Sequence, residues 1–420
     1  MTYDAVVIGV GLAGLTAALR LAEEGLRVAV VAKGVGGTHL APATIDVLGY
    51  EDGPVESPAR ALPEFAARHP EHPYGRLSTN VIHASLEWFR DRLDGLAYQG
   101  GLDRNLLLPT AVGVAKPTAL VPQTMAAGDL RAGGRFVFVG LRGLKDFYPA
   151  YLAGNLARAR LPGGVSVSAR AVELRPRLDG ERDVSGVGFA GRFERQDFRE
   201  SIIRELKPRL APGEVVGFPA VLGLRHAEEV WRELEAGLRR RVFEVPTLPP
   251  SVGGIRVFES LTAALRRKGA RIVIGSTVDG AQSDGRRLTG VVAQTSGRPR
   301  LYRARAFVLA SGGFSSGGLE VDSHGRARET ILDLPVAGAP EPGDPRFASG
   351  YLDEHPIAGA GLAVDEQLRP LGAGGAPAFE NLHAAGAALA GAVPWREASG
   401  NGLSLSTGYA AASAILEEAP

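Results

Sequence analysis

The sequence predicts an α/β fold, and three observations lead to this prediction. A glycine-rich turn links a short apolar strand pattern to a helix pattern at residues 4–24, strand and helix patterns alternate again beyond residue 256, and the segment between them is patterned differently. Together they predict a discontinuous Rossmann-like domain, residues 1–50 and 246–420, with an inserted α/β cap domain at residues 51–245.

The first element is a strand at residues 4–9, a short β-branched run typical of a buried parallel strand. A helix is expected over residues 12–24, where Leu12, Leu15 and Leu19 recur at helical spacing and Gly25 supplies a C-terminal cap. Residues 27–32 form the next strand pattern. These three segments predict a β-α-β unit.

Gly9, Gly11 and Gly14 stand between this strand and helix in the order G-x-G-x-x-G. The first permits a tight turn, the second lets a pyrophosphate approach the backbone, and the third lets helix and strand pack closely. Leu12 and Ala13 open the helix, whose unpaired N–H groups and positive dipole end favour phosphates. The motif predicts a dinucleotide site of the FAD/NAD(P) type.

The ribose contact expected of this motif is missing. An Asp or Glu is expected at the end of the second strand, but Ala32 and then Lys33 occupy that place. Either backbone groups between Lys33 and Thr38 hold the ribose, or the ligand lacks that ribose.

The rest of the nucleotide-binding domain is predicted from residue 246 onward. A helix at 256–268 precedes strands at 271–274, 288–294 and 306–310, and the last strand leads into Gly312 and Gly313. Bare backbone there suits a ligand edge. A strand at 381–386 then turns at Gly386, and Asn401, Gly402 and Leu403 open a small-residue helix that reaches about residue 416. These residues complete the predicted cofactor site.

The insertion has its own pattern. Pro-rich turns lead into a helix at 80–93, and apolar strands are expected at 135–140 and 214–219, each followed by a Gly-containing turn and a helix. We expect this α/β domain to cap a ligand.

Composition excludes several classes of function. With no Cys in 420 residues, the chain has no disulfide, thiolate zinc site or Cys-ligated iron–sulfur cluster, and we predict no metal site. Lys+Arg 47 against Asp+Glu 46 gives no global field for nucleic acid. No apolar run reaches a membrane span and no signal peptide is evident, so a cytoplasmic protein is expected.

Several further motifs carry a family resemblance. They are Val6–Gly14, His72-Pro-Tyr74, Gly140–Phe147, Pro246-Thr-Leu-Pro-Pro-Ser251, Val308–Leu319, Asp365–Pro370 and Glu380–Gly386. With them the chain resembles the B subunit of anaerobic glycerol-3-phosphate dehydrogenase, a flavoprotein family related to the succinate dehydrogenase and fumarate reductase flavoproteins.

The resemblance implies oxidation of sn-glycerol 3-phosphate to dihydroxyacetone phosphate, with electrons passed to a quinone. It also implies a larger FAD-bearing A subunit and an iron–sulfur C subunit that docks the pair on the inner face of the membrane. FMN is the flavin that the family implies, whereas the N-terminal pyrophosphate motif indicates FAD.

The catalytic candidates are a base and a cation. His355, in a Pro/Gly-rich loop, is the predicted base, and Arg256, at the start of a helix where a cation is off-pattern, is the predicted phosphate or carboxylate contact. Two other functions stay open. One is a stand-alone flavoenzyme of the fumarate reductase or aspartate oxidase type, and the other is a non-catalytic scaffold or electron-transfer subunit, which Ala32 favours.

Overall fold

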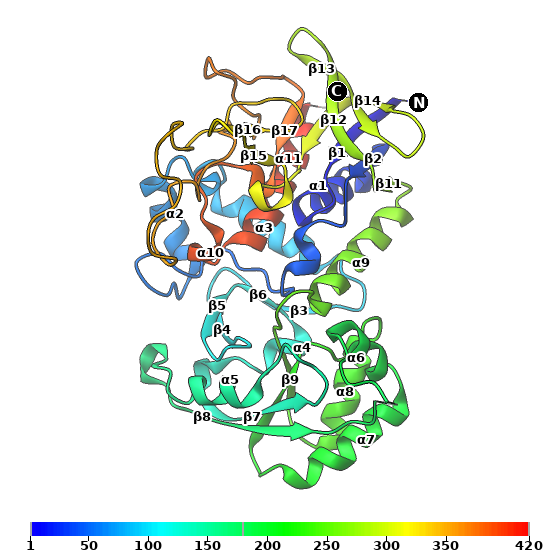
Figure 1. Ribbon diagram of the computed structural model, residues 1–420, viewed down its shortest axis with the longest axis vertical. Coiled ribbons are helices and arrows are strands. Elements are labelled where there is room, and N and C mark those ends of the chain that lie inside the picture. Colours follow the sequence, from blue (N-terminus) through cyan, green and yellow to red (C-terminus); the bar gives the residue numbers. More distant parts are fainter. Residues whose placement is uncertain (1, 179, 419–420) are drawn as a thin grey trace. The chain divides into compact units, whose positions relative to one another are not determined.

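Figure 1 shows the computed structural model of the chain, which describes residues 2–178 and 180–418. The chain divides into two compact units. The first comprises Met1–Gly37, Ala59–Arg92 and Leu261–Pro420, and the second comprises Thr38–Pro58 and Leu93–Ser260. Each unit is built on a parallel or largely parallel sheet.

The sheet of the first unit has the strand order β11-β2-β1-β14-β13-β12, and β17 also pairs with β14. β11, β2, β1, β14 and β17 run parallel, whereas β13 is antiparallel to both of its neighbours. The strand bounds are β1 Thr2–Ile8, β2 Val28–Ala32, β11 Arg271–Ile274, β12 Thr277–Asp284, β13 Arg287–Gln294, β14 Arg300–Leu309 and β17 Leu382–Ala384.

Its central strands are buried runs of small and β-branched residues. All of β2 is buried, and β1 places Val6 beside Ala29 on one side and beside Phe307 on the other. Strands buried on both faces need no polar alternation, which is why the sequence pattern there is continuous. The carboxyl ends of β2, β1, β14 and β17 therefore meet at one edge of this sheet.

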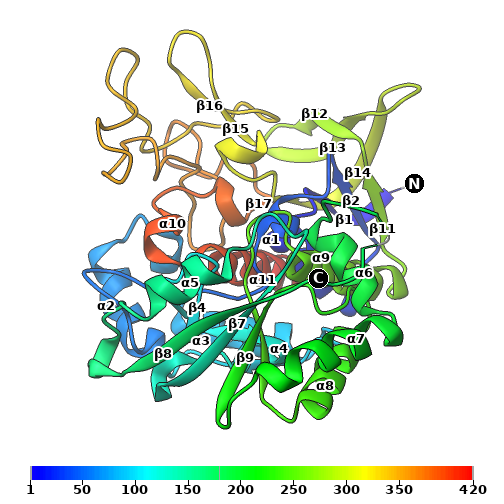
Figure 2. The same ribbon diagram turned by 60° about the horizontal axis from the view of Figure 1, so that its bottom comes forward.

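Helices and short elements cover this sheet. α1 and α11 lie side by side in Figures 1 and 2. Gly408 of α11 permits this close approach, because a Cβ atom at its position would lie 2.4 Å from the Ala13 carbonyl oxygen of α1. The remaining elements of this part of the chain are α1 Leu12–Glu23, α2 Pro58–Arg68, η2 Pro73–Gly75, α3 Thr79–Arg90, η6 Phe314–Ser316, β15 Leu319–Val321, β16 Ala327–Glu329, η7 Gly386–Ala388, α10 Pro394–Glu397 and α11 Gly400–Glu418.

The second unit has an all-parallel sheet in the order β10-β9-β7-β8. If β7, β8, β9 and β10 are numbered 1 to 4, the sheet read from β8 has the order 2-1-3-4, which is a doubly wound arrangement. Its strands are β7 Gly134–Leu141, β8 Val167–Leu174, β9 Glu214–Pro219 and β10 Val242–Val245. Two antiparallel strand pairs accompany the sheet: β3 Tyr98–Gly100 with β6 Leu120–Pro122, and between them in the chain the hairpin of β4 Leu106–Pro109 and β5 Ala115–Thr118.

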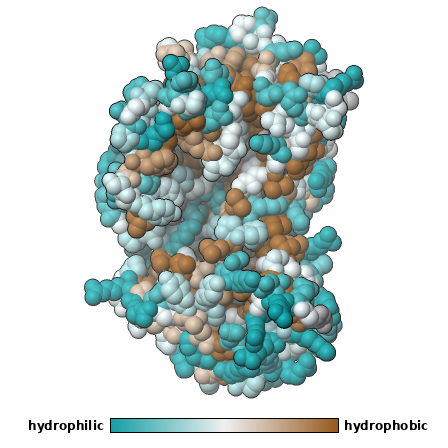
Figure 3. Space-filling view, in the orientation of Figure 1, coloured by the Kyte–Doolittle hydropathy of each residue, from teal (hydrophilic) through white to brown (hydrophobic). Residues whose placement is uncertain are grey.

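The helices of the second unit follow its strands. They are η1 Gly37–Leu40, α4 Gln123–Ala126, η3 Leu130–Ala132, α5 Pro149–Leu156, η4 Pro162–Gly164, α6 Gly186–Phe193, α7 Gln196–Leu206, η5 Lys207–Arg209 and α8 Ala227–Leu238, and α9 Val252–Arg267 ends in the first unit. The outward face of α7 and α8, at the lower right of Figure 3, is mainly hydrophilic.

Both faces of the second sheet are packed. Along β7, Val137 and Val139 belong to one apolar cluster, while Phe136 and Phe138 belong to another on the opposite face. This period of two is the geometry of a strand between two helix layers. The sheet is a second α/β core with its own carboxyl edge.

The predicted fold class is confirmed: an α/β chain carries a Rossmann-like domain with an additional α/β domain. The two units divide the chain differently from the predicted domains: residues 59–92 belong to the first unit, and residues 38–50 and 246–260 belong to the second. α3 packs against α11, where Trp88 meets Tyr409 with ring centroids 6.0 Å apart. The sequence shows only that α3 follows Pro-rich turns, so its contact with the distant α11 could not be predicted.

In the first unit's sheet, two strands were incompletely predicted. β14 begins at Arg300, six residues before the expected start, and β12 had no prediction. β12 is mostly exposed, and the first half of β14 alternates between exposed Arg and buried residues, so neither segment has a continuous apolar signal. Among the described residues no helix is both long and apolar enough to cross a membrane.

Candidate functional site

The turn between β1 and α1 is built from glycines that have no room for a side chain. Gly9 has φ +109°, and its Cβ position would lie 2.1 Å from the Ala310 carbonyl oxygen. Its N–H donates to the Val31 carbonyl oxygen at 2.9 Å. The Cβ position of Gly14 would lie 2.2 Å from the Gly9 carbonyl oxygen. These two glycines are therefore required for packing between β1, β14 and α1.

Gly11 is different because its Cβ position meets nothing within 4 Å. It is the N-cap residue of α1, with φ −66° and ψ 177°, and no side chain caps the helix. The first N–H groups of α1 thus face open space at the positive end of the helix dipole. A phosphate fits this place, where a side chain at position 11 would stand in its way.

The loop after β2 closes on this turn. The Cβ position of Gly36, which has φ +72°, would lie 2.9 Å from Gly11 Cα. Ala32 ends β2, and its carbonyl oxygen accepts N–H bonds from Gly275 and Ser276. Lys33 follows, exposed. No carboxylate stands at this strand end, so the expected ribose acceptor is absent from it.

On the other side of β1, the segment after β14 contributes bare backbone. Gly312 has φ +82°, and the Cβ position of Gly313 would lie 2.7 Å from the Ala387 carbonyl oxygen. The Ser311 hydroxyl is buried with no hydrogen-bond partner among the described residues. An unpaired buried hydroxyl at a strand end is consistent with a ligand contact.

Gly386 joins this edge from β17. Its N–H donates to Thr407 Oγ1 of α11 at 2.9 Å, and its Cβ position would lie 2.9 Å from Ala13 Cβ. Ser404 Oγ lies 3.7 Å from the same position. The first turn of α11, with Asn401, Gly402 and Leu403, is thereby held next to the β1–α1 turn.

A buried hydrogen bond between His72 and Glu397 fixes the segment that leads into α11. His72, 1% exposed, accepts an N–H bond from Tyr74 at Nδ1, so its Nε2 carries hydrogen toward Glu397 Oε2 at 3.3 Å. Ser399 Oγ donates to the same carboxylate at 2.7 Å. Burial raises the pKa of Glu397, but the bonds from His72 and Ser399 outweigh it and lower that pKa. These hydrogen bonds connect His72 with Glu397, which lie far apart in the sequence, so no spacing pattern predicts the contact.

The structure brings most of the predicted cofactor residues to one edge of the first sheet. They are Gly9, Gly11, Leu12, Ala13, Gly14, Ala32, Lys33, Gly312, Gly313, Gly386, Asn401, Gly402 and Leu403. Thr38 belongs to the second unit, where its buried hydroxyl has no partner in the described part of the chain. Contact of each with a cofactor stays a prediction.

Three further members of this edge were not among the predicted site residues. Gly36 lies in a run of glycines that marks a tight loop, and Ser311 directly precedes Gly312. Either could be found from the sequence. Thr407 could not, because its role depends on the packing of α11 against Gly386.

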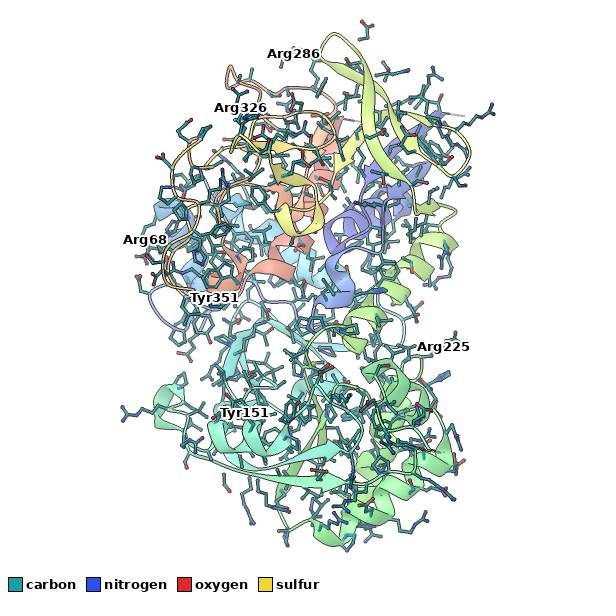
Figure 4. The ribbon with its side chains drawn as sticks, in the orientation of Figure 1. Arg68, Tyr151, Arg225, Arg286, Arg326 and Tyr351 are labelled. Atoms are coloured by element: carbon teal, nitrogen blue, oxygen red, sulfur yellow. The ribbon has the colours of Figure 1, made fainter. Side chains whose placement is uncertain are left out.

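His355 lies in a loop of the first unit, and both of its ring nitrogens are occupied. Nδ1 accepts the Ala348 N–H at 3.2 Å, and Nε2 lies 3.1 Å from the Tyr351 carbonyl oxygen. Tyr351, labelled in Figure 4, is itself exposed. These contacts favour a role for His355 in stabilising the loop. Its role as the catalytic base stays a prediction.

Arg256 forms a buried ion pair with Glu244 in the second unit. Its Nη1 donates to Glu244 Oε2 at 2.7 Å and its Nε to the Gly223 carbonyl oxygen at 2.9 Å, while Arg256 is 4% exposed and Glu244 0%. Glu244 also accepts bonds from the Thr124 hydroxyl at 2.7 Å and the Leu222 N–H at 2.8 Å. The network favours a structural role over the predicted ligand contact.

Comparison with known families gives a match over most of the chain. The family described as "FAD binding domain" matches residues 4–403.

Curated relatives match over their full length. The probable B subunit of the anaerobic glycerol-3-phosphate dehydrogenase of Halobacterium salinarum is 33% identical over 432 residues, which cover 99% of this chain and 98% of that protein. The B subunit of the anaerobic glycerol-3-phosphate dehydrogenase of Pectobacterium atrosepticum is also 33% identical, over 430 residues that cover 100% of this chain and 99% of that protein. Among solved structures, 3-ketosteroid delta1-dehydrogenase from Sterolibacterium denitrificans covers 100% of both chains, at 14% identity and a TM-score of 0.49.

Proposed function

The chain belongs to the FAD binding domain family and to the family of anaerobic glycerol-3-phosphate dehydrogenase B subunits, and from this premise we propose that it oxidises sn-glycerol 3-phosphate to dihydroxyacetone phosphate with FAD. The observation that carries the proposal is the 33% identity over the whole length of both proteins. Full-length identity preserves both units, not only the glycine motif that many nucleotide-binding proteins share.

FAD is the flavin that the first unit fits. The open N-terminus of α1 at Gly11 suits a pyrophosphate, and Gly312, Gly313 and Gly386 offer backbone at the same edge. When bound, FAD supplies a two-electron acceptor for the hydrogen that leaves the alcohol carbon. With Ala32 at the end of β2, backbone groups of residues 33–37 are the proposed contacts of the adenosine ribose.

The proposed reaction requires a partner for the electrons. This chain contains no Cys and hence no Cys-ligated iron–sulfur cluster, so electrons leave it for another subunit or a diffusible acceptor. Its curated relatives are named as subunits of a dehydrogenase. We propose an A subunit and an iron–sulfur C subunit as its partners, a quinone as the final acceptor, and peripheral placement at the inner membrane face through the C subunit.

Co-expression with the A subunit tests this function. The complex should be yellow, should release FAD on denaturation, and should reduce a dye when sn-glycerol 3-phosphate is added. Chromatography of the released flavin separates FAD from FMN. A coloured complex that does not respond to sn-glycerol 3-phosphate, or a single chain that reduces fumarate, would overturn the proposal.

Ala32 favours a second candidate function, a scaffold that retains the flavin fold to hold the A subunit. The same preparation separates the two. A colourless chain that restores dye reduction to the A subunit would establish the scaffold, whereas stoichiometric FAD in this chain would exclude it.

A further inference from the structure

The second unit contains a cavity of about 260 Å³. It is bounded by the loop after η1, by the β4–β5 hairpin and by the segment that follows β10. Its polar lining consists of Lys116, Thr44, Thr110, Thr118 and Thr247, set among Leu and Pro side chains. All of these segments belong to the second unit, so the cavity is complete within it.

One wall of the cavity lies at the carboxyl edge of the second unit's sheet, after its outermost strand β10. Residues 246–249 follow the last residue of β10 directly, so they stand at the carboxyl edge of the sheet β10-β9-β7-β8. In doubly wound α/β sheets this edge is the usual ligand-binding edge. The Pro246–Ser251 segment is thus placed at a ligand-binding edge that the dinucleotide motif does not explain.

Lys116 is the charged residue of the lining, and its ammonium group is paired with a carboxylate that lies outside the lining. Its Nζ forms an ion pair with Asp46 Oδ2, and Asp46 Oδ1 accepts the Thr44 hydroxyl at 3.1 Å. Asp46 is 6% exposed and does not line the cavity, whereas the Lys116 side chain is 31% exposed. An ammonium has three N–H donors, so two remain for a ligand after the bond to Asp46.

The chemistry of the lining defines a class of ligand. The Thr44 and Thr118 hydroxyls donate to Asp46 Oδ1 and to the Ile45 carbonyl oxygen, so Thr110 and Thr247 supply the hydroxyl groups of the lining. An ammonium in an apolar lining that also carries hydroxyl groups favours a small anion that itself has hydroxyl groups. A volume of about 260 Å³ is below that of sites for drug-sized molecules, so the ligand is small. A polyol phosphate monoester meets all three conditions.

We propose that this cavity binds the phosphate monoester substrate, with Lys116 Nζ on the phosphate and Asp46 as the ion-pair partner of that ammonium. The proposal rests on the proposed function for the identity of the monoester. Lys116 is a binding residue in it, and Thr110 and Thr247 supply hydroxyls for the polyol.

Titration calorimetry of the purified chain tests the site, with sn-glycerol 3-phosphate, glycerol and inorganic phosphate as titrants. Wild type should bind sn-glycerol 3-phosphate and not glycerol. Lys116→Met should raise the Kd about tenfold or more, and Lys116→Arg should retain binding within about threefold. Lys207→Met, an exposed lysine of the same unit outside the cavity, is the matched control and should leave the Kd unchanged.

Asp46 separates a ligand site from a merely structural ion pair. Asp46→Asn keeps an acceptor for Thr44 and leaves the ammonium in place, so sn-glycerol 3-phosphate should still bind within about threefold of wild type. The double variant Lys116→Met/Asp46→Asn, which leaves no unpaired charge, should bind as weakly as Lys116→Met. Equal loss in Asp46→Asn and Lys116→Met would overturn the proposal.

The complex with the A subunit distinguishes the two proposals. Lys116→Met should raise the KM for sn-glycerol 3-phosphate about tenfold with little change in kcat. If the wild-type complex oxidises sn-glycerol 3-phosphate but neither KM nor Kd responds to Lys116→Met, the site is overturned and the function stands. If wild type neither binds nor oxidises this compound, both are overturned.

Discussion

Two helices that follow parallel strands differ in what lies just before their N-termini. In the first unit, α1 has Gly11 as its N-cap residue, no side-chain cap and a free Cβ position there. In the second unit, Glu194 lies before α8, and its Oε1 accepts the N–H groups of Leu224 at 2.7 Å, Arg225 at 2.7 Å and the N-cap residue His226 at 3.2 Å. A carboxylate of the chain itself is thus held at the segment that leads into α8, whereas we propose an external anion at the start of α1.

The carboxyl edges of the two sheets differ in the same way. In the first unit glycines bring backbone close to backbone and leave the strand ends free of charged side chains. In the second, Glu244 and Arg256 fill the space beside the ends of β9 and β10 with a satisfied network. The first edge offers backbone groups to a ligand, whereas the second offers side chains.

Breaking the Arg256–Glu244 pair should have the largest effect. Arg256→Met leaves the Glu244 carboxylate buried beside only the Thr124 hydroxyl and the Leu222 N–H, so the free energy of unfolding should fall by about 3–5 kcal/mol. Denaturant unfolding of the purified chain measures it. Arg267→Met, at the end of the same helix, is the control, and a stable Arg256→Met variant with weaker sn-glycerol 3-phosphate binding would instead support the predicted ligand contact.

Removing the carboxylate beneath α8 should have a smaller effect that depends on pH. Although burial raises the pKa of Glu194, hydrogen bonds from Arg225, His226 and Leu224 lower it to about 2. A depressed pKa means that the carboxylate stabilises the fold above the unfolded-state pKa of 4.5, and that this contribution is lost as pH falls toward about 2. Glu194→Gln should therefore cost about 1–3 kcal/mol at pH 7.

The measurement is the difference in free energy of unfolding between wild type and Glu194→Gln across pH. That difference should stay nearly constant above about pH 5 and shrink as pH is lowered from about 4.5 toward about 2, because the unfolded chain takes up the proton before the folded carboxylate does. Glu200→Gln, an exposed residue of the neighbouring α7, serves as control. A difference that stays constant with pH would contradict the assigned role of Glu194.

The two units also differ in what the sequence could predict. The β-α-β turn was predictable because Gly9, Gly11 and Gly14 lie within six residues, and Gly9 and Gly14 stand where only glycine fits. The fold class followed from the same local signals. Residues that act through their side chains in the second unit come from segments 70 to 120 positions apart, such as Asp46 with Lys116 and Thr124 with Glu244.

For that reason the catalytic predictions were the weakest. Arg256 was expected to face a ligand because a cation is off-pattern at the start of a helix, yet a carboxylate on β10 satisfies it. His355 was chosen for its place in a loop, and two local backbone groups occupy its ring. Partners of this kind depend on tertiary packing, which composition and spacing do not encode.

Adding a side-chain N-cap to α1 should change the free energy of unfolding least of these variants. It also tests most directly whether the N-terminus of α1 is a phosphate site. Gly11→Asp places a carboxylate at an N-cap position whose φ of −66° and ψ of 177° suit it, and whose Cβ position is free. The chain should fold with its free energy of unfolding within about 1 kcal/mol of wild type. It should lose FAD, because the new carboxylate occupies and repels the pyrophosphate position.

Flavin absorbance per chain after purification, together with thermal unfolding, measures both effects. Gly280→Asp, at an open glycine of β12, should keep wild-type flavin content. Gly9→Ala supplies the opposite contrast: its methyl group would lie 2.1 Å from a carbonyl oxygen at positive φ, so it should lose stability and flavin together. If Gly11→Asp retained full FAD, the open end of α1 would not be the phosphate site, and the two helix N-termini would differ only in how they are capped.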